Sequence, residues 1–347
     1  MTRLKRYLSA LGLLMGALFG IAFIQRWVPL TLDLRAVMPA RGYRFQLRDD
    51  TYFNSTQTLP GSPLQASNED GSKLPACPEE SPHILGPLNI NVSLVISIEE
   101  VVFVYPNVRP GGHFNPADCE ARQRIAIVIP FRRREWHLSL WLFYMHQFLQ
   151  RQQADYGIYV IEQHGNATFN RAKLLNVGFA EALKDYDYNC FIFSDIDIIP
   201  MDDRNYYRCY NNPRHMANAV DKFKFKLLYN TLFGGVTAFS KTQFQKVNGF
   251  SNAFWGWGGE DDEMYSRVVA AGMRVERPNS VMARSKMIPH HRDPGNETNK
   301  KNVVLMQYAR ANMKQDGLNS LQYKVVNITR HHLYTRICVD IGKPEEI

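Results

Sequence analysis

Three short apolar runs, separated by stretches of helical periodicity, constrain the fold of this chain more than any other feature. The runs span residues 125–129, 156–161 and 190–193 and have the length of strands buried on both faces. After Trp136 and over residues 171–183, apolar residues recur at helical spacing. This order predicts parallel strands joined by right-handed crossovers. We therefore expect one α/β domain with a Rossmann-like, mostly parallel sheet, flanking helices, and ligands beyond the carboxyl ends of the strands.

The first residues of the chain predict a membrane anchor. Basic residues precede an apolar stretch over residues 7–24, and Arg26 follows it. The stretch is near the lower length limit of a membrane-spanning helix and is longer than the apolar part of a signal peptide. The positive flank favours a cytoplasmic N-terminus. We expect a cytoplasmic tail over residues 1–6, a signal-anchor helix over residues 7–25 and a lumenal remainder; a cleaved signal peptide is the alternative.

The segment after the anchor is typical of a stem. Residues 26–75 are rich in Ser, Pro, Asn, Gly and Asp and show no hydrophobic period, which indicates a flexible linker. The lumenal domain is expected over residues 76–347. Its candidates for N-glycosylation are Asn54 in the stem and Asn91, Asn166, Asn296 and Asn327 in the domain. Of the five cysteines, four can pair in an oxidising compartment, although these spacings alone do not assign the pairs.

The positive charge of the chain is spread along its sequence. The formal net charge is +8, but Lys and Arg are scattered and form no long basic run. Nucleic-acid-binding domains usually gather these residues on one face. We therefore expect no nucleic acid partner, and the charge remains compatible with an anionic small ligand or a membrane surface.

Acidic and basic residues follow the predicted strands. Asp195 and Asp197 come directly after the third apolar run, where two carboxylates can bind one Mn²⁺ or Mg²⁺ ion. A solvated acidic turn is the alternative. The segment 130–134 (PFRRR) follows the first run, and the segment 169–173 (FNRAK) precedes a helix. Arginine side chains and a helix N-terminus suit a diphosphate, although both segments are equally compatible with ordinary surface charge.

The most specific segment is WGWGGEDD, residues 255–262. Its glycines allow tight turns, and its Trp rings offer platforms for the apolar face of a sugar. The acids Glu260, Asp261 and Asp262 could simply stabilise the start of a helix, since its dipole favours negative charge there. A capping role does not need the Trp and Gly residues, so we favour a binding site with a carboxylate that acts as general base.

Two further residues are weaker candidates. His290 is a candidate metal ligand. The nearby Met287 would not be chosen for a hard cation, because a thioether is a soft ligand. The pair His331 and His332 is interpreted as structural.

Taken together, these segments resemble one family, the β1,4-galactosyltransferases of glycosyltransferase family 7. The matching stretches are residues 77–82 (CPEESP), 169–179 (FNRAKLLNVGF), 193–197 (FSDID), 233–236 (FGGV), 255–262 and 316–320 (DGLNS). The resemblance covers about residues 75–342 and leaves out the stem. It implies a GT-A fold, a bound Mn²⁺ ion and an inverting transfer from UDP-GalNAc or UDP-Gal to the 4-OH of terminal β-GlcNAc. It also implies a Golgi membrane protein with a single span, whose lumenal domain acts on glycans of glycoproteins or glycolipids; a homodimer is left open.

The resemblance also implies a role for each matching residue. Asp261 corresponds to the catalytic base, with Glu260 beside it, and Asp197, Met287 and His290 correspond to the metal ligands. Residues implied in donor and UDP binding are Pro130, Phe131, Arg132, Arg171, Asp195, Ile196, Lys222, Leu232 and Trp257. Residues implied in acceptor binding are Tyr229, Gly258, Gly259, Asp262, Asn302, Val303 and Met306. The implied disulfides are Cys77–Cys119 and Cys190–Cys209, and the loop around Trp257 is implied to close over the donor.

The chain departs from the family pattern in three respects. Leu232 stands where the vertebrate galactosyltransferases have Tyr, and the smaller side chain leaves room for an N-acetyl group, as in the invertebrate N-acetylgalactosaminyltransferases. We therefore expect UDP-GalNAc as donor; a galactosyltransferase making N-acetyllactosamine is the alternative, and an inactive carbohydrate-binding protein is the alternative from another class. Asn302, Val303 and Met306 replace an Arg-Phe…Ile acceptor pocket, which leaves acceptor preference open. Nothing in the sequence explains Arg133 in place of Asn.

Overall fold

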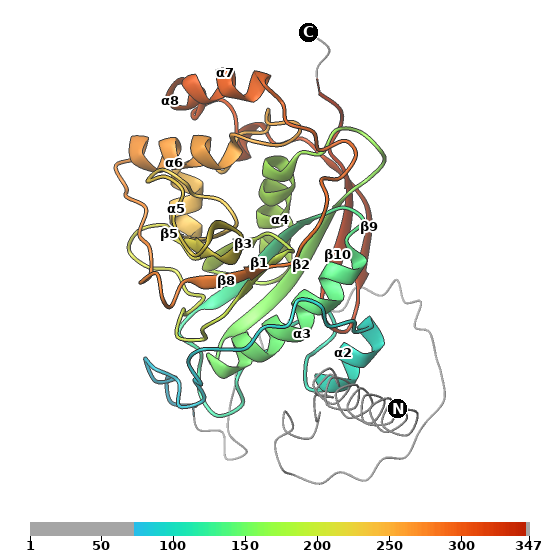
Figure 1. Cartoon of the computed structure of the whole chain (residues 1–347), viewed down its shortest axis with the longest axis vertical. Helices are drawn as coiled ribbons and strands as arrows, with labels where there is room; N and C mark the ends of the chain where they lie inside the picture. The colour runs from blue at the N-terminus through green and yellow to red at the C-terminus, as the bar shows by residue number, and fades with distance from the viewer. Residues whose placement is uncertain (1–72, 345–347) are drawn as a thin grey trace, which may run out of the picture. The chain divides into compact units, whose positions relative to one another are not determined.

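The computed structural model describes residues 73–344, which Figure 1 draws in colour. The predicted tail and anchor, Asn54 and nearly all of the stem therefore lie outside the described residues. Within the described part of the chain, no helix is long and apolar enough to cross a membrane.

The described residues form helices, strands and two short 3₁₀ turns. The helices are α2 (Ile98–Val104), α3 (Glu135–Arg151), α4 (Arg171–Asp185), α5 (Lys241–Lys246), α6 (Glu260–Ala270), α7 (Lys301–Gln307) and α8 (Ala309–Asn312). The strands are β1 (Arg124–Phe131), β2 (Asp155–Gln163), β3 (Cys190–Ser194), β4 (Ile198–Pro200), β5 (Arg214–His215), β6 (Ala219–Val220), β7 (Val236–Ser240), β8 (Arg284–Met287), β9 (Lys324–Arg330) and β10 (Thr335–Asp340). The 3₁₀ turns are η2 (Asp221–Phe223) and η3 (Leu318–Ser320).

The main sheet has seven strands in the order β5-β7-β3-β1-β2-β10-β9. Strands β3, β1, β2 and β10 are parallel to one another, whereas β7 and β9 run antiparallel to them, and the edge strand β5 pairs antiparallel with β7. The parallel centre predicted from the alternation of strands and helices is confirmed. The sequence predicts that this strand ends at Pro130, but β1 continues through it. Pairing of β1 with β3 stops at Val128, so Pro130 is paired only with β2, and a proline, which has no N–H to donate, is tolerated there.

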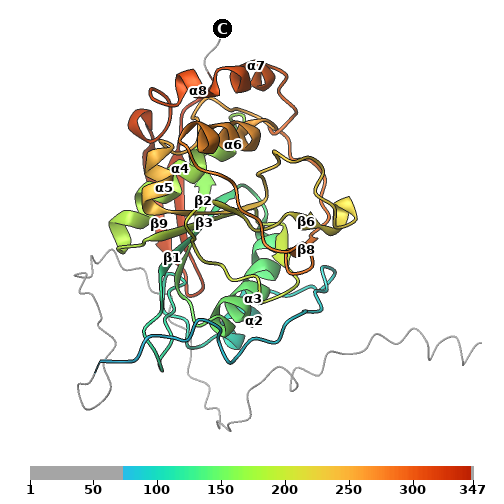
Figure 2. The same ribbon diagram turned by 90° about the vertical axis from the view of Figure 1, so that its left-hand side faces the viewer.

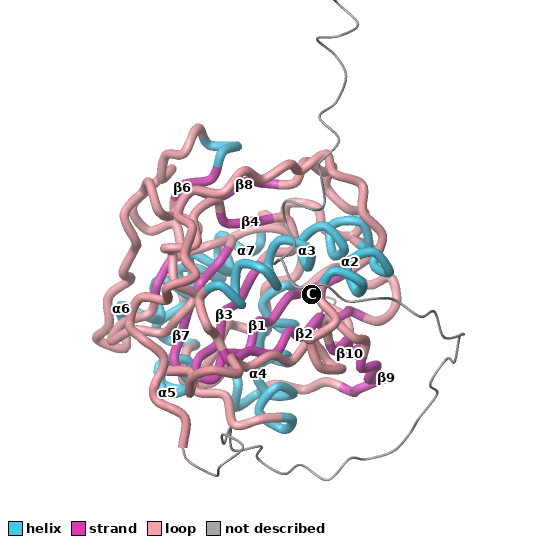
Figure 3. Tube along the Cα trace, turned by 90° about the horizontal axis from the view of Figure 1, so that it is seen from below, coloured by secondary structure: helices cyan, strands magenta, loops and turns pink. Residues whose placement is uncertain are grey.

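Helices cover both faces of the sheet. Along β1, Ile125, Ile127 and Ile129 join the core beneath α2 and α3, and the alternate residues join the core beneath α4 and α5. Figure 3 shows these two pairs of helices on opposite sides of the strands. Helix α4 approaches β1 so closely that a Cβ at Gly178 would lie 2.2 Å from Val128 Cγ1. The glycine thus allows the close packing that fixes the start of α4 at the edge of the sheet.

A small second sheet completes the edge where ligands are expected. Its order is β4-β8-β6, and Ile198 of β4 lies opposite Met287 of β8. The pairing brings the segment after β3 next to a segment ninety residues later in the chain. Beyond it, α6 packs against α7 and α8, and Figure 2 shows these three helices together.

Two disulfides tie loops to this framework. Cys77 is bonded to Cys119, and Cys190, the first residue of β3, is bonded to Cys209. These are the pairs that the family resemblance implies. Cys338 in β10 is free.

Candidate active site

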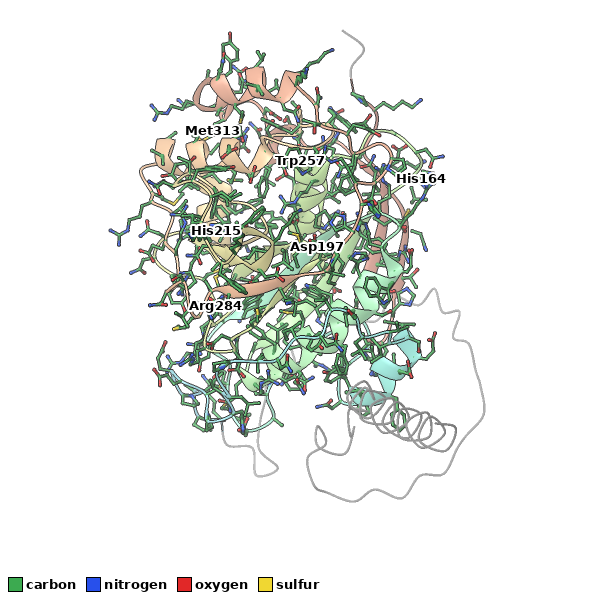
Figure 4. All side chains as sticks on the ribbon, in the orientation of Figure 1. His164, Asp197, His215, Trp257, Arg284 and Met313 are labelled. Atoms are coloured by element: carbon green, nitrogen blue, oxygen red, sulfur yellow. A yellow bond between two sulfur atoms is a disulfide. The ribbon has the colours of Figure 1, made fainter. Side chains whose placement is uncertain are left out.

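The predicted site residues gather beyond the carboxyl ends of β1, β2 and β3. Asp195 and Asp197 follow β3, Arg132 follows β1, and Arg171 is the first residue of α4, which begins after β2. Trp257, in the loop before α6, lies toward the same region; Figure 4 labels it together with Asp197. This edge of the sheet is where an open α/β fold binds its ligands.

Arg171 connects two carboxylates from separate elements. Its Nε donates to Asp195 Oδ1 at 2.6 Å, and its Nη1 lies 3.6 Å from Glu260 Oε1. Burial raises the pKa of Asp195, and Arg171 opposes that shift. Burial and the neighbouring charge of Asp261 raise the pKa of Glu260 to about 7, again against the effect of Arg171. Arg171 therefore joins β3, α4 and α6 into one charged cluster at the predicted donor side.

The three predicted metal ligands, Asp197, Met287 and His290, come from segments that lie side by side. His290 Nε2 is 2.9 Å from Asp197 Oδ2, and the Ile288 N–H donates to the Asp197 carbonyl at 2.8 Å. Met287 lies opposite Ile198, the residue after Asp197. Within residues 73–344, no three side chains of His, Cys, Asp or Glu gather as a metal site. A metal site here would combine a carboxylate and an imidazole, which suit Mn²⁺, with one thioether, which is a softer ligand.

The residues of the WGWGG segment are held by a second loop. Gly256 N–H donates to the Phe169 carbonyl at 2.7 Å and Trp257 N–H to the Glu297 carbonyl at 2.9 Å. Asn302 Nδ2 donates to the Gly258 carbonyl at 2.7 Å. The Trp257 side chain is 53% exposed, so its ring is available on one face. The predicted lid residues are therefore joined along their backbone to residues 295–302.

The three acids occupy the first turn of α6, which begins after Gly259 at φ +92°. This position agrees with the alternative that the three acids only stabilise the start of a helix, but Asp261 has a further neighbour. A Cβ at Gly234 would lie 2.5 Å from Asp261 Oδ2, so the FGGV turn before β7 can approach the carboxylate only as glycine. Burial and the charge of Asp261 raise the pKa of Asp262 to about 6.

A pocket of about 390 Å³ lies beside these acids. Its lining includes three of the predicted acceptor residues, Tyr229, Asp262 and Met306. The Tyr229 hydroxyl donates to Asp262 Oδ2 at 3.3 Å. Another small cavity, between Cys77 and Tyr207, lies among residues with no predicted role in the site.

Comparison with known proteins identifies the family. Two family models match, the N-terminal region of glycosyl transferase group 7 over residues 77–210 and the N-terminal domain of galactosyltransferase over residues 214–291. Human β1,4-galactosyltransferase 1 is 55% identical over 271 residues, which are 78% of this chain and 68% of that protein. β1,4-Galactosyltransferase 2 of Cricetulus griseus is 49% identical over 93% of this chain and 88% of its own length.

This chain belongs to glycosyltransferase family 7.

A solved structure of the family gives the same fold. The catalytic domain of Drosophila β1,4-galactosyltransferase 7, in complex with xylobiose, matches with a TM-score of 0.56 and 27% identity over 63% of this chain and 94% of that domain. A D211N mutant of the same enzyme, solved with manganese, UDP-Gal and xylobiose, matches equally well at 28% identity. The family 7 chain is thus a UDP-sugar-dependent glycosyltransferase with a GT-A fold, as the resemblance implies.

The remaining predicted residues of this family 7 chain take varied positions. Arg132 donates to the Ala167 and Pro294 carbonyls at 2.7 and 3.1 Å, which links the end of β1 to the loops beside the lid. Asn302 is buried, whereas Val303 is 54% exposed. Leu232 is partly buried, and its carbonyl accepts from Arg277 Nη2 at 3.0 Å. Lys222 lies in η2 with an exposed side chain, next to Asp221, whose Oδ1 accepts from the Met287 N–H.

Sequence reasoning missed Arg134. Its Nη2 lies 2.8 Å from His290 Nδ1 and 2.7 Å from Asp293 Oδ2, and its Nη1 lies 3.2 Å from His137 Nε2. It therefore orients a predicted metal ligand. The only sequence signal for this residue was the basic segment PFRRR, and nothing in that segment distinguishes Arg134 from the arginines beside it.

Five pocket residues were also missed. These are Thr231, Tyr265, Ser266, Val269 and Arg310. Tyr265, Ser266 and Val269 follow Asp262 at positions i+3, i+4 and i+7, so the helical spacing from a predicted acceptor residue could have identified them. Arg310, on α8, has no such signal, because only the packing of α8 against α6 brings it to the pocket.

Proposed function

We propose that this enzyme transfers galactose from UDP-Gal to the 4-OH of a terminal β-GlcNAc on glycoprotein or glycolipid glycans, in β1,4 linkage and with inversion. The position of Asp261 supports this proposal most directly. The residue before it contacts Arg171 on the donor side, and the residue after it lines the pocket on the acceptor side. In the proposed complex, Asp261 would therefore stand between the nucleotide-sugar and the sugar hydroxyl.

The proposed reaction is a single displacement. The acceptor 4-OH oxygen forms a bond to C1 of the donor sugar while the bond from C1 to the diphosphate oxygen breaks. The Asp261 carboxylate takes the hydroxyl proton, which makes the oxygen a better nucleophile. Asp262 and Tyr229 orient the acceptor in the pocket, and the partly exposed Trp257 ring covers the sugar. Because attack and departure occur on opposite faces of C1, an α-linked donor gives a β-linked product.

Asp197, His290 and Met287 are the residues that would hold a Mn²⁺ ion. When bound, the ion would neutralise the charge of the diphosphate leaving group. Arg171, held by Asp195 and Glu260, contributes positive charge at the same side of the site. Pro130, Phe131, Arg132, Ile196 and Lys222 are proposed to complete the UDP site, and Gly258, Gly259, Asn302, Val303 and Met306 the acceptor site.

UDP-GalNAc is the second candidate donor, and Leu232 favours it. The relatives named above are galactosyltransferases, which supports UDP-Gal. Leu232 is smaller than Tyr and lies two residues before Gly234, which faces Asp261, so it leaves space beside the reacting sugar.

A donor assay separates the two candidates. Initial rates from UDP-Gal and UDP-GalNAc onto a GlcNAc-terminated acceptor should favour UDP-Gal if the main proposal is right. Leu232→Tyr should then leave the UDP-Gal rate nearly unchanged and lower any UDP-GalNAc rate by about 10- to 200-fold, the range for steric rejection in a pocket. A wild-type preference for UDP-GalNAc would replace the main proposal with the second.

We also propose that the enzyme is a single-pass Golgi membrane protein with a lumenal catalytic domain. The supporting features are the apolar stretch over residues 7–25, the stem-like composition of residues 26–75 and the disulfides of the domain over residues 76–347. Fractionation of cells that express the full chain should place it in Golgi membranes. Release into the medium of a chain that begins after residue 25 would instead indicate a cleaved leader.

A further inference from the structure

Strand β9 leaves one edge of the main sheet open. It pairs with β10 on one side, and no strand among residues 73–344 pairs with its other side. Val326 and Ile328 on this strand are 48% and 44% exposed. An exposed edge strand with β-branched side chains is a template for pairing with another chain.

A free thiol lies one strand away from this edge. Cys338 of β10 is partly exposed, and it is the only one of the five cysteines that forms no disulfide. Its sulfur lies 3.8 Å from His164 Nδ1. In an oxidising compartment, such a thiol can exchange with small disulfides and then link two chains.

The register of the two strands places Asn327 beside this cysteine. Asn327 is the cross-strand partner of Cys338, and Ile328 is the partner of Ile337. Partners on neighbouring strands share a face and have Cβ atoms about 4.5–5.5 Å apart. Because Ile337 is buried in the core beneath α4, Asn327 and Cys338 lie on the opposite face of the sheet.

Asn327 begins the triplet Asn-Ile-Thr. Its side chain is exposed, and its Nδ2 donates to the Thr329 hydroxyl at 3.0 Å. The amide is therefore directed along the strand toward the hydroxyl that defines the glycosylation triplet.

We propose that Asn327 carries an N-linked glycan that covers Cys338 and the open edge of β9, and so prevents disulfides between chains. In the transfer, Asn327 Nδ2 forms a bond to C1 of the first sugar of a lipid-diphosphate-linked oligosaccharide, the bond from C1 to the diphosphate breaks, and the amide loses a proton. The sugars then need to reach across only one strand spacing, about 4.8 Å. The inference rests on the lumenal location proposed above.

Peptide mass spectrometry and gels test the two parts of the proposal. The full chain is expressed in a secretory eukaryotic cell, and deglycosylation in ¹⁸O-water should label Asn327 as a formerly glycosylated site. Thr329→Ala removes the triplet, and we expect dimers on non-reducing gels after exposure to oxidised glutathione. The control Thr329→Ser keeps the triplet and should remain monomeric, and the double variant with Cys338→Ser should lose the dimers.

Each other outcome overturns the inference. If Asn327 is unmodified while Asn91 carries a glycan, the lumenal location holds and the Asn327 site is wrong. If Thr329→Ala stays monomeric, or if the glycosylated wild type is already linked through Cys338, the shielding role is wrong. If no triplet is modified at all, the lumenal proposal fails as well. Galactose transfer onto a GlcNAc-terminated acceptor, measured on the same samples, tests the proposed reaction separately from the modification of Asn327.

Discussion

Asp261 differs from its acidic neighbours in what it contacts. Glu260 reaches Arg171 and Asp262 lines the pocket, whereas the Asp261 carboxylate is next to Gly234. A side chain at position 234 would push this carboxylate out of place. The proposed role of Asp261 thus depends on a glycine from a different part of the chain, which no local sequence rule reveals.

Asp261→Asn should nearly abolish transfer without unfolding the enzyme. The amide has a similar size but cannot take the proton, so kcat should fall by about 10²- to 10⁴-fold, the usual contribution of a general base. Steady-state rates with donor and acceptor measure this effect, and circular dichroism checks the fold. Full activity in this variant would mean that another group is the base, and loss of all sugar binding would point to an unfolded protein instead.

The pH dependence of acceptor use should depend on Asp262. Burial and the charge of Asp261 raise the pKa of Asp262 to about 6, so this acid is largely neutral below pH 6 and ionised above it. Only the ionised form accepts hydrogen bonds through both oxygens. We expect kcat/KM for the acceptor to rise with pH through about 6, and Asp262→Asn to have a lower value that lacks this rise. An unchanged profile in the variant would assign the titration to another group.

At the scale of elements, the predicted lid is held by backbone hydrogen bonds, by side-chain bonds such as that of Asn302, and by a ring contact of Trp257. The guanidinium of Arg292 lies 4.6 Å from the centroid of the Trp257 ring, and the same side chain hydrogen-bonds Thr298. Residues 255–259 and 295–302 therefore form one unit through Trp257. We propose that this unit closes over the donor and excludes water.

Arg292→Ala should loosen the lid. An exposed cation–π contact contributes about 0.5–1 kcal/mol, so the KM for the donor should rise by about 2- to 5-fold. Hydrogen exchange of residues 255–259 should become faster, which a purely catalytic role would not cause. Arg284→Ala is the control, because Arg284, at the start of β8, lies 5.0 Å from the centroid of the Phe225 ring. This change should leave the KM for the donor and the hydrogen exchange of residues 255–259 unaltered. Unchanged exchange in Arg292→Ala would show that the remaining hydrogen bonds hold the predicted lid without the Arg292 contact.

At the scale of the whole molecule, a disulfide secures the strand that carries the site. Cys190 begins β3, which ends just before Asp195, and its bond partner Cys209 lies at a sequence separation of 19. The segment between the two cysteines thus includes Asp195 and Asp197. Closing a loop of this size removes conformational entropy from the unfolded chain.

Replacing both cysteines should lower the stability of the domain. We expect Cys190→Ala/Cys209→Ala to reduce the free energy of unfolding by about 3 kcal/mol, as measured by urea denaturation of the glycosylated protein. Cys338 closes no loop, so Cys338→Ser should change the free energy of unfolding by less than about 0.5 kcal/mol. A loss of less than 1 kcal/mol in the double variant would mean that packing around β3 already fixes the segment.

The sequence by itself determined the parallel centre of the sheet, the acids after β3 and the family. These follow from local patterns: apolar runs of strand length, helical spacing between them and short diagnostic stretches such as WGWGGEDD. The tertiary structure decided the rest. The antiparallel edges, the contact of Gly234 with Asp261, the approach of Arg134 to His290 and the arrival of Arg310 at the pocket all join segments distant in the chain. These features depend on how the elements pack against one another, and sequence periodicity does not encode that packing.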